Sequence, residues 1–246
     1  MRFGSGLGTD GVGVNGDFGF LYRPHERFQL GVTYRTESVV HSQGQASGNA
    51  SAQLQSLGGD FLNVPPDFRY DAEVVNHFPQ MVMAGLSWKI HSRVRLALEV
   101  DWINWSAAFD HLQIKLKHGN NEVLNSFVGS TAAEDFVPLL WQDRFVYRGG
   151  LEFRVAENFF LRTGYSYGKS PVPDGTLTPL TGVISEQTFA AGAGYRRGRY
   201  QVDLGYQYNL PMRRQTHLSD LKAGEYSNSQ VELDIHWVAL STSIWF

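Results

Sequence analysis

Apolar and polar side chains alternate strictly along several long stretches of the chain. The clearest stretch covers residues 200–210, and the same period of two recurs over residues 28–37, 94–102 and 143–154. This period places successive side chains on opposite faces of an extended backbone, so each stretch predicts a β-strand with one apolar and one polar face. In the first stretch the apolar positions are Tyr200, Val202, Leu204, Tyr206, Tyr208 and Leu210, and the polar or small positions are Gln201, Asp203, Gly205, Gln207 and Asn209.

The alternation predicts nine strands whose connections alternate in length. The strands are expected at about residues 12–22, 28–39, 80–89, 94–115, 143–154, 159–168, 187–196, 200–210 and 232–246. Short turns are expected near residues 24–26, 90–92, 156–158 and 197–198, and long loops near residues 40–79, 116–142, 169–186 and 211–231. Short turns at one end and long loops at the other are typical of outer-membrane barrels. We therefore predict an all-β fold, a transmembrane antiparallel β-barrel.

A soluble sandwich or barrel would show the same alternation, with its apolar face turned inward. Two features favour the membrane barrel. Tyr, Phe and Trp gather near the strand ends on the apolar face, as in the aromatic girdles of membrane barrels. The opposite face carries charges and glycines, which suit a wet or ligand-lined lumen. This face includes Asp17, Arg35, Glu37, Glu99, Asp101, Arg148, Glu152, Arg162 and Asp203.

Composition narrows the choice of partners and chemistry. The 246 residues include 26 glycines and 13% aromatic residues, which favours β structure with many turns. A formal net charge of −3 without a basic run argues against nucleic acid as a partner. The chain has no cysteine, which excludes disulfides, thiol catalysis and cysteine-ligated zinc. No window has eighteen consecutive apolar residues, so no transmembrane helix is expected.

The C-terminal residues ALSTSIWF close an alternating strand on an aromatic side chain, Phe246. This ending is similar to the C-terminal signal by which bacterial outer-membrane proteins are recognised, so we expect the barrel-assembly machinery as a partner through Phe246. If this end lies in the periplasm, nine strands place the start of the first strand outside the cell. Complete bacterial barrels have an even strand number. The strand count thus predicts that residues 1–246 are part of a larger barrel.

Three segments together carry a resemblance to a known family. They are WINWSAAFDHLQI, then DRFVYRGGLEFRVAENFFLRTGYSYGKSPVPDG, and the final strand that ends in Phe246. They resemble the FadL/TodX-type outer-membrane transporters of long-chain fatty acids and other hydrophobic compounds. The resemblance implies a fourteen-stranded barrel in the outer membrane of a Gram-negative bacterium. The nine strands would be its last nine, with the N-terminal hatch and the first five strands absent from residues 1–246.

The resemblance implies a transport function with two elements. Members of the family capture a hydrophobic substrate between two external loops and pass it into the barrel. Here an apolar cluster in the first long loop is the candidate capture site: Leu54, Leu57, Phe61, Leu62 and Val64. Such a cluster on a loop expected to face water fits a ligand site, and the alternative is that it packs the loop onto the barrel. The competing function is a general outer-membrane porin for polar solutes, against which this apolar loop argues.

Arg148 and Arg162 are the candidate ligand-binding residues inside the barrel. They are expected on neighbouring strands with both side chains directed inward. A guanidinium fits the carboxylate of a fatty acid. The alternative, which the residues alone favour, is an interior network of ion pairs with Glu152, Glu99 or Asp101.

Gly164-Tyr165-Ser166-Tyr167-Gly168 matches the G-x-S-x-G pattern of a hydrolase nucleophile elbow. An elbow requires a turn from a strand into a helix, whereas Ser166 lies within an alternating strand and Pro171 and Pro173 follow it. The two neighbouring strands carry no histidine to serve as a base. We therefore predict a protein that is not an enzyme. The eight histidines show no metal-binding spacing, and neither a cofactor nor a metal is expected.

Overall fold

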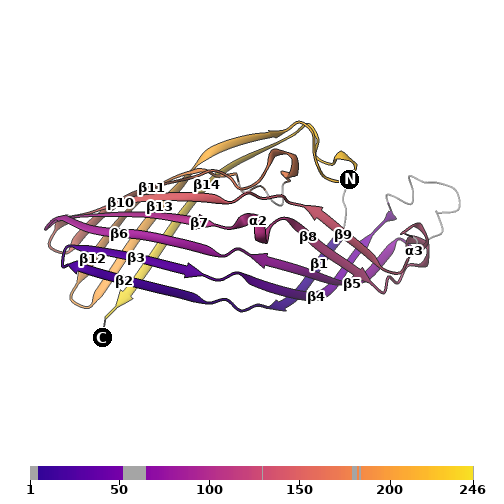
Figure 1. Cartoon of the computed structure of the whole chain (residues 1–246), viewed down its shortest axis with the longest axis horizontal. Helices are drawn as coiled ribbons and strands as arrows, with labels where there is room; N and C mark the ends of the chain where they lie inside the picture. Colours follow the sequence, from indigo (N-terminus) through magenta and orange to yellow (C-terminus); the bar gives the residue numbers. More distant parts are fainter. Residues whose placement is uncertain (1–4, 52–64, 129, 179–181, 183, 246) are drawn as a thin grey trace. The chain divides into compact units, whose positions relative to one another are not determined.

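The computed structural model describes residues 5–51, 65–128, 130–178, 182 and 184–245. The chain divides into two compact units. The five-stranded unit comprises residues 1–14, 38–78 and 111–138, and the nine-stranded unit comprises residues 15–37, 79–110 and 139–246. Each unit contains one antiparallel sheet (Figure 1).

The nine predicted strands are confirmed as a single antiparallel sheet in the nine-stranded unit. Its order is β14-β13-β12-β11-β10-β7-β6-β3-β2. The four predicted short turns are also present, because each pair β2–β3, β6–β7, β10–β11 and β12–β13 is joined by two residues. The strands are β2 (Asp17–His25), β3 (Phe28–Arg35), β6 (Met81–His91), β7 (Val94–Ile103), β10 (Arg144–Ala156), β11 (Phe159–Gly168), β12 (Gln187–Arg197), β13 (Tyr200–Thr216) and β14 (Ser229–Ile244).

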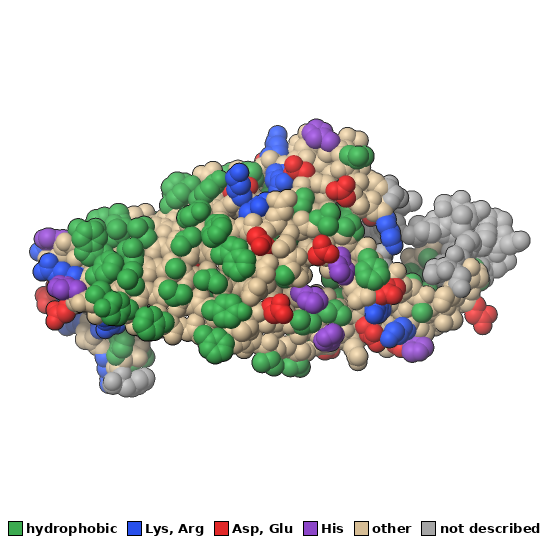
Figure 2. All heavy atoms as spheres, viewed as in Figure 1, with side chains coloured by type: hydrophobic (Ala, Val, Ile, Leu, Met, Phe, Trp, Pro, Cys, Tyr) green, Lys and Arg blue, Asp and Glu red, His purple; other side chains and the backbone are tan. Residues whose placement is uncertain are grey.

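The apolar face of the nine-stranded sheet is exposed. Leu204 of β13 lies opposite Leu240 of β14, and the exposed fractions of the two residues are 54% and 72%. Hydrophobic side chains cover much of the visible surface of this unit (Figure 2). The sheet curls, so that β12 to β14 run behind β2, β3 and β6 (Figure 1). A continuous apolar surface of this extent is unfavourable in water and fits a hydrocarbon environment.

The sheet of the nine-stranded unit is not closed into a barrel. β2 and β14 are its two edges, and no described residue of β2 pairs with β14. An edge strand carries unpaired N–H and C=O groups, which are costly in hydrocarbon. Both edges therefore need a partner within a membrane.

The five-stranded unit corrects the prediction of long loops. Residues 40–79 and 116–142 were expected to be loops, yet they hold most of a sheet of order β1-β4-β5-β8-β9. The expected strand 94–115 is interrupted by α2 (Trp105–Ala108). A second unexpected helix is α3 (Glu122–Val128). The five strands are β1 (Ser5–Val12), β4 (Ser38–Asn49), β5 (Asp67–Phe78), β8 (His111–Lys117) and β9 (Ala133–Pro138).

The strand β4 was missed because its alternation is weak. β4 reads SVVHSQGQASGN, in which small and polar residues occupy both faces. The strand is held instead by twelve consecutive pairs with β5, from Ser38↔Phe78 to Asn49↔Asp67. Pairing in the ladder, rather than a clear pattern, thus determines the structure of this segment. None of the described helices is long and apolar enough to cross a membrane.

The apolar face of the five-stranded sheet is the buried one. Tyr70, Ala72 and Val74 of β5 are only 7%, 1% and 6% exposed. The other face is polar, with a Lys117 Nζ to Glu73 Oε1 distance of 2.8 Å and a Lys115 Nζ to Glu134 Oε1 distance of 3.5 Å. The hydrogen bond from Lys117 holds the pKa of the Glu73 carboxyl below its usual value. This arrangement suits a sheet surrounded by water.

Loop residues 169–178, 182 and 184–186 form a small core within the nine-stranded unit. Val172, Leu177 and Ile184 are at most 1% exposed. The hydroxyl of Thr176 donates to the carbonyl oxygen of Leu139 at 2.6 Å, and the Arg214 guanidinium donates to the carbonyl oxygen of Val172 at 2.7 Å. The rings of Trp105, Phe109 and Trp141 pack together, with centroids 4.4–5.5 Å apart. The loop is therefore a packed element that joins several strand ends.

The exposed apolar face predicts a pattern of thiol accessibility along β13. Because the protein has no cysteine, single cysteines at Leu204 and Gly205 report opposite faces of one strand. A Cβ at Gly205 meets no atom within 4 Å, so the substitution is tolerated. In lipid vesicles, Gly205→Cys is expected to react with a charged maleimide and Leu204→Cys to be protected. Labelling in denaturant shows the reactivity of each thiol when it is fully accessible. If the two variants also react equally in vesicles, the apolar surface does not face lipid.

Candidate ligand-binding lumen

The register of the sheet places the predicted inward residues in rows across the strands. Arg148 of β10 lies opposite Glu99 of β7 and Ser166 of β11. Two rows further along the strands, Arg162 of β11 lies opposite Glu152 of β10 and Gly192 of β12. Paired residues of an antiparallel sheet share a face, so these side chains line the face opposite the apolar surface. We call this polar face the lumen face.

Arg148 holds two carboxylates of β7. Its Nη1 lies 2.6 Å from Glu99 Oε1 and also contacts Asp101 Oδ2. The Asp101 side chain is only 4% exposed, and its Oδ1 has no hydrogen-bond partner among the described residues. The group carries two negative charges and one positive charge when all three residues are ionised. A buried carboxylate is costly without a cation, so the contact with Arg148 offsets part of the cost of burying Asp101.

Arg162 forms a second network on the lumen face. Its Nε lies 2.8 Å from Glu152 Oε2 and its Nη1 lies 2.6 Å from Asp203 Oδ1. Arg95 Nη1 approaches the other oxygen of Glu152 at 3.7 Å. Gly194 leaves space for the pair, because a Cβ there would lie 2.3 Å from Asp203 Oδ1 and 3.0 Å from Arg162 Nη1.

These contacts bear on the two predicted roles of the arginines. The inward placement of Arg148 and Arg162 follows from the register, and each guanidinium is engaged by two carboxylates. These contacts are those of an interior ion-pair network, which was the predicted alternative to binding of a fatty-acid carboxylate. Binding of a ligand carboxylate by either arginine stays a prediction.

A hollow of about 240 Å³ lies on the lumen face beside the first network. Gly31 of β3 and Gly85 of β6 are paired and leave room at its base. Its walls combine apolar side chains with a few polar groups, which is the usual composition of a small-molecule site. The residues that line it, besides the two glycines, are Leu21, Gln29, Thr33, Met83, Leu86, Ser87 and Glu99.

Sequence reasoning did not find this hollow, because the two glycines that form it are only an incomplete signal. Gly31 and Gly85 stand at lumen-face positions of strands that are otherwise regular. Their pairing depends on the register of β3 with β6, which joins residues more than fifty positions apart. A second hollow, of about 620 Å³, lies chiefly on the apolar face, where Ala84 is surrounded by Leu30, Val32 and Val100 among others. It faces the surroundings of the sheet rather than the lumen.

The predicted capture residues of the first long loop, Leu54, Leu57, Phe61, Leu62 and Val64, lie outside the described residues, as does Phe246. The structure does define where this loop begins and ends. Asn49 at the end of β4 pairs with Asp67 at the start of β5, and the Asn49 Nδ2 to Asp67 Oδ1 distance is 2.7 Å. The loop therefore connects two adjacent strands of the five-stranded sheet.

Ser166 lies within β11, between Arg148 and Thr188 of the neighbouring strands. The backbone there is a regular strand rather than a turn into a helix. Ser166 therefore lies on the lumen face, in the same row as Arg148. Within the described part of the chain, no group of three or more His, Asp or Glu side chains could hold a metal ion.

Several solved structures share this fold. The toluene transporter TodX of Pseudomonas putida is 19% identical, with a TM-score of 0.71 over 96% of this chain and 50% of TodX. The toluene transporter TbuX of Ralstonia pickettii is 16% identical, with a TM-score of 0.66 over 95% of this chain and 48% of TbuX. A FadL homologue of Pseudomonas aeruginosa is 15% identical, with a TM-score of 0.65 over 92% of this chain and 51% of that protein. The chain spans about half the length of these proteins.

No curated protein sequence is significantly similar to the chain. The sequence model of one family matches residues 5–244, which is nearly the whole chain, and its description is outer membrane protein transport protein (OMPP1/FadL/TodX). The match agrees with the antiparallel sheet and its exposed apolar face. The chain therefore belongs to the OMPP1/FadL/TodX family of outer-membrane transport proteins.

Proposed function

We propose that this protein takes part in the uptake of long-chain fatty acids or related hydrophobic compounds across the outer membrane of a Gram-negative bacterium. The observation that carries the proposal is the family match over residues 5–244. In this proposal the substrate is first captured at the apolar loop of residues 54–64, which lies outside the described residues. It later occupies the lumen hollow at Gly31 and Gly85.

The chemistry of the lumen hollow supports a small or narrow hydrophobic substrate. Leu21 and Met83 offer apolar contacts, and the flexible thioether of methionine adapts to ligands of different shape. The paired glycines keep the backbone close to the ligand. A water-filled porin for polar solutes gains nothing from such contacts, so they favour a hydrophobic compound.

The charge of the lumen distinguishes two kinds of hydrophobic substrate. Arg148 is shared by Glu99 and Asp101, so this network repels an additional carboxylate unless one of the acids yields its place. A monoaromatic hydrocarbon, the cargo named for TodX and TbuX, requires no cation. A fatty acid requires Arg148 or Arg162 to exchange a protein carboxylate for its own.

Uptake by cells that produce the protein tests the function. Cells that lack other transporters of this kind are supplied with radiolabelled oleate, toluene or glucose. Uptake of oleate, of toluene or of both is expected to rise above that of cells without the protein, whereas glucose uptake stays the same. If only glucose uptake rises, the protein is a general porin.

Capture at the external loop predicts a loss of uptake on adding charge there. Leu57→Asp together with Phe61→Asp is expected to weaken hydrophobic substrate binding at least tenfold. The reason is that each apolar side chain buried against the substrate contributes about 1.5–3 kcal/mol to the binding free energy. Initial uptake at limiting substrate measures the effect. Gln55→Asp with Asn63→Asp adds the same charge to polar positions of this loop and is the matched control. Equal uptake by the two double variants removes the capture role.

The lumen hollow predicts that filling it blocks transport. Gly31→Phe is expected to lower uptake to the background level, because a Cβ at Gly31 has room and the ring then occupies the hollow. Gly205→Phe places the same ring on the lumen face away from the hollow. Its uptake is expected to stay near that of the unchanged protein. If both variants fold normally and both keep their uptake, the substrate takes another route.

The role of Arg148 is tested by separating charge from hydrophobicity. Arg148→Met is combined with Asp101→Asn, so that no buried carboxylate is left unpaired. If the arginine binds a fatty-acid carboxylate, the oleate affinity falls about 10- to 100-fold, as expected from 1.5–3 kcal/mol for a hydrogen bond to a charged group. Toluene binding stays constant. Unchanged affinity for both ligands, measured by titration of the purified protein, shows that Arg148 serves only the ion-pair network.

A further inference from the structure

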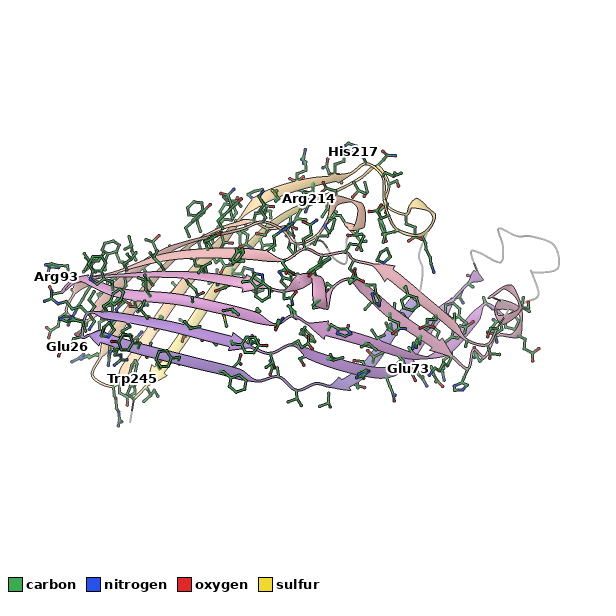
Figure 3. All side chains as sticks on the ribbon, in the orientation of Figure 1. Glu26, Glu73, Arg93, Arg214, His217 and Trp245 are labelled. Carbon is green, nitrogen blue, oxygen red and sulfur yellow. The ribbon has the colours of Figure 1, made fainter. Side chains whose placement is uncertain are left out.

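The short-turn end of the nine-stranded unit carries a dense group of basic side chains. Eight exposed basic residues and only two acidic ones, Glu26 and Glu157, lie at the four short turns. Figure 3 labels Arg93, Glu26 and Trp245 at this end of the unit. The eight basic residues, which we call the basic rim, are Arg23, Arg27, Lys89, Arg93, Arg154, Arg196, Arg197 and Arg199.

No carboxylate of the described residues neutralises the charges of the basic rim. None of its eight members forms an ion pair with a carboxylate of the described residues. The lumen arginines Arg35, Arg148 and Arg162 differ, since each of them holds at least one carboxylate. The basic rim therefore offers unused positive charge and hydrogen-bond donors to an anion from outside the chain.

Aromatic side chains accompany these cations. The guanidinium of Arg196 lies 4.4 Å from the centroid of the Trp245 ring, and that of Arg199 lies 5.3 Å from the Tyr200 ring. Tyr and Trp beside Arg are typical of the boundary between the hydrocarbon and the headgroups of a membrane. The basic rim thus lies where the phosphate groups of lipids are expected.

One part of the basic rim has the shape of a binding cleft. A cleft of about 570 Å³ surrounds the β12–β13 turn and is lined by Tyr195, Arg197, Gly198, Arg199, Tyr200 and Val202. Tyr195 and Val202 are paired on the apolar face and are 46% and 45% exposed. The cleft therefore joins two guanidinium groups that hold no described carboxylate to an apolar wall that continues along the sheet.

We propose that this cleft binds an anionic phospholipid, such as phosphatidylglycerol. The phosphate lies between Arg197 and Arg199, since guanidinium groups bind phosphate oxygens in a bidentate manner. One acyl chain follows Tyr195 and Val202 along the apolar face. The short turns of outer-membrane barrels face the periplasm, so the lipid comes from the inner leaflet. The site is independent of the compound that the protein transports.

Lipid titration of the purified full chain tests the site. The delipidated protein in a nonionic detergent is mixed with phosphatidylglycerol, phosphatidylcholine or glycerol 3-phosphate, and bound lipid is counted by native mass spectrometry. Phosphatidylglycerol is expected to bind most tightly, because phosphatidylcholine lacks the net charge and glycerol 3-phosphate lacks the acyl chains. Equal binding of the two phospholipids overturns the proposal, and so does equal binding of glycerol 3-phosphate.

Variants locate the lipid within the basic rim. Arg197→Gln with Arg199→Gln is expected to weaken phosphatidylglycerol binding about 25-fold, from about fivefold for each basic residue near a lipid surface. Lys89→Gln with Arg93→Gln removes two exposed charges at another turn and is expected to change binding less than about threefold. Circular dichroism checks that all variants keep the β structure. An equal loss in both double variants, or none in the first, contradicts a specific cleft.

Discussion

The pairing of backbone N–H and C=O groups in a hydrocarbon environment is the constraint on which the nine-stranded unit depends. Without water to satisfy these groups, only helices and paired strands can cross a membrane. Once the chain is extended and paired, its period of two divides the side chains between lipid and lumen. Strand length, aromatic belts and the glycine-lined interior all follow from that division.

The two units apply the same alternation in opposite ways. Leu204 and Leu240 on the apolar face of the nine-stranded sheet are exposed, whereas Ala72 and Val74 on the apolar face of the five-stranded sheet are buried. In water, the hydrophobic effect drives burial of the apolar face of the five-stranded sheet. In lipid, the apolar face of the nine-stranded sheet gains nothing from burial, because the acyl chains are equally apolar. On the lumen face, Arg148 and Arg162 are held by carboxylates of the same sheet.

Much of this arrangement could be predicted from the sequence. The nine strands and the inward placement of Arg148 and Arg162 follow from local alternation, which side-chain hydrophobicity alone determines. The strand β4 and the hollow at Gly31 and Gly85 could not be predicted. Both depend on the register between distant segments, and a single sequence contains no local signal for it.

The central claim is that a hydrophobic compound occupies the lumen face of the nine-stranded sheet. Photolabelling tests it most directly: the protein in lipid vesicles is irradiated with a diazirine-bearing hydrophobic compound, and the labelled residues are identified by peptide mass spectrometry. The account predicts labels on Leu21 and Met83 in the lumen hollow, removed by excess unlabelled compound. Labels confined to apolar-face residues such as Leu204 and Leu240, and unaffected by competition, would contradict it.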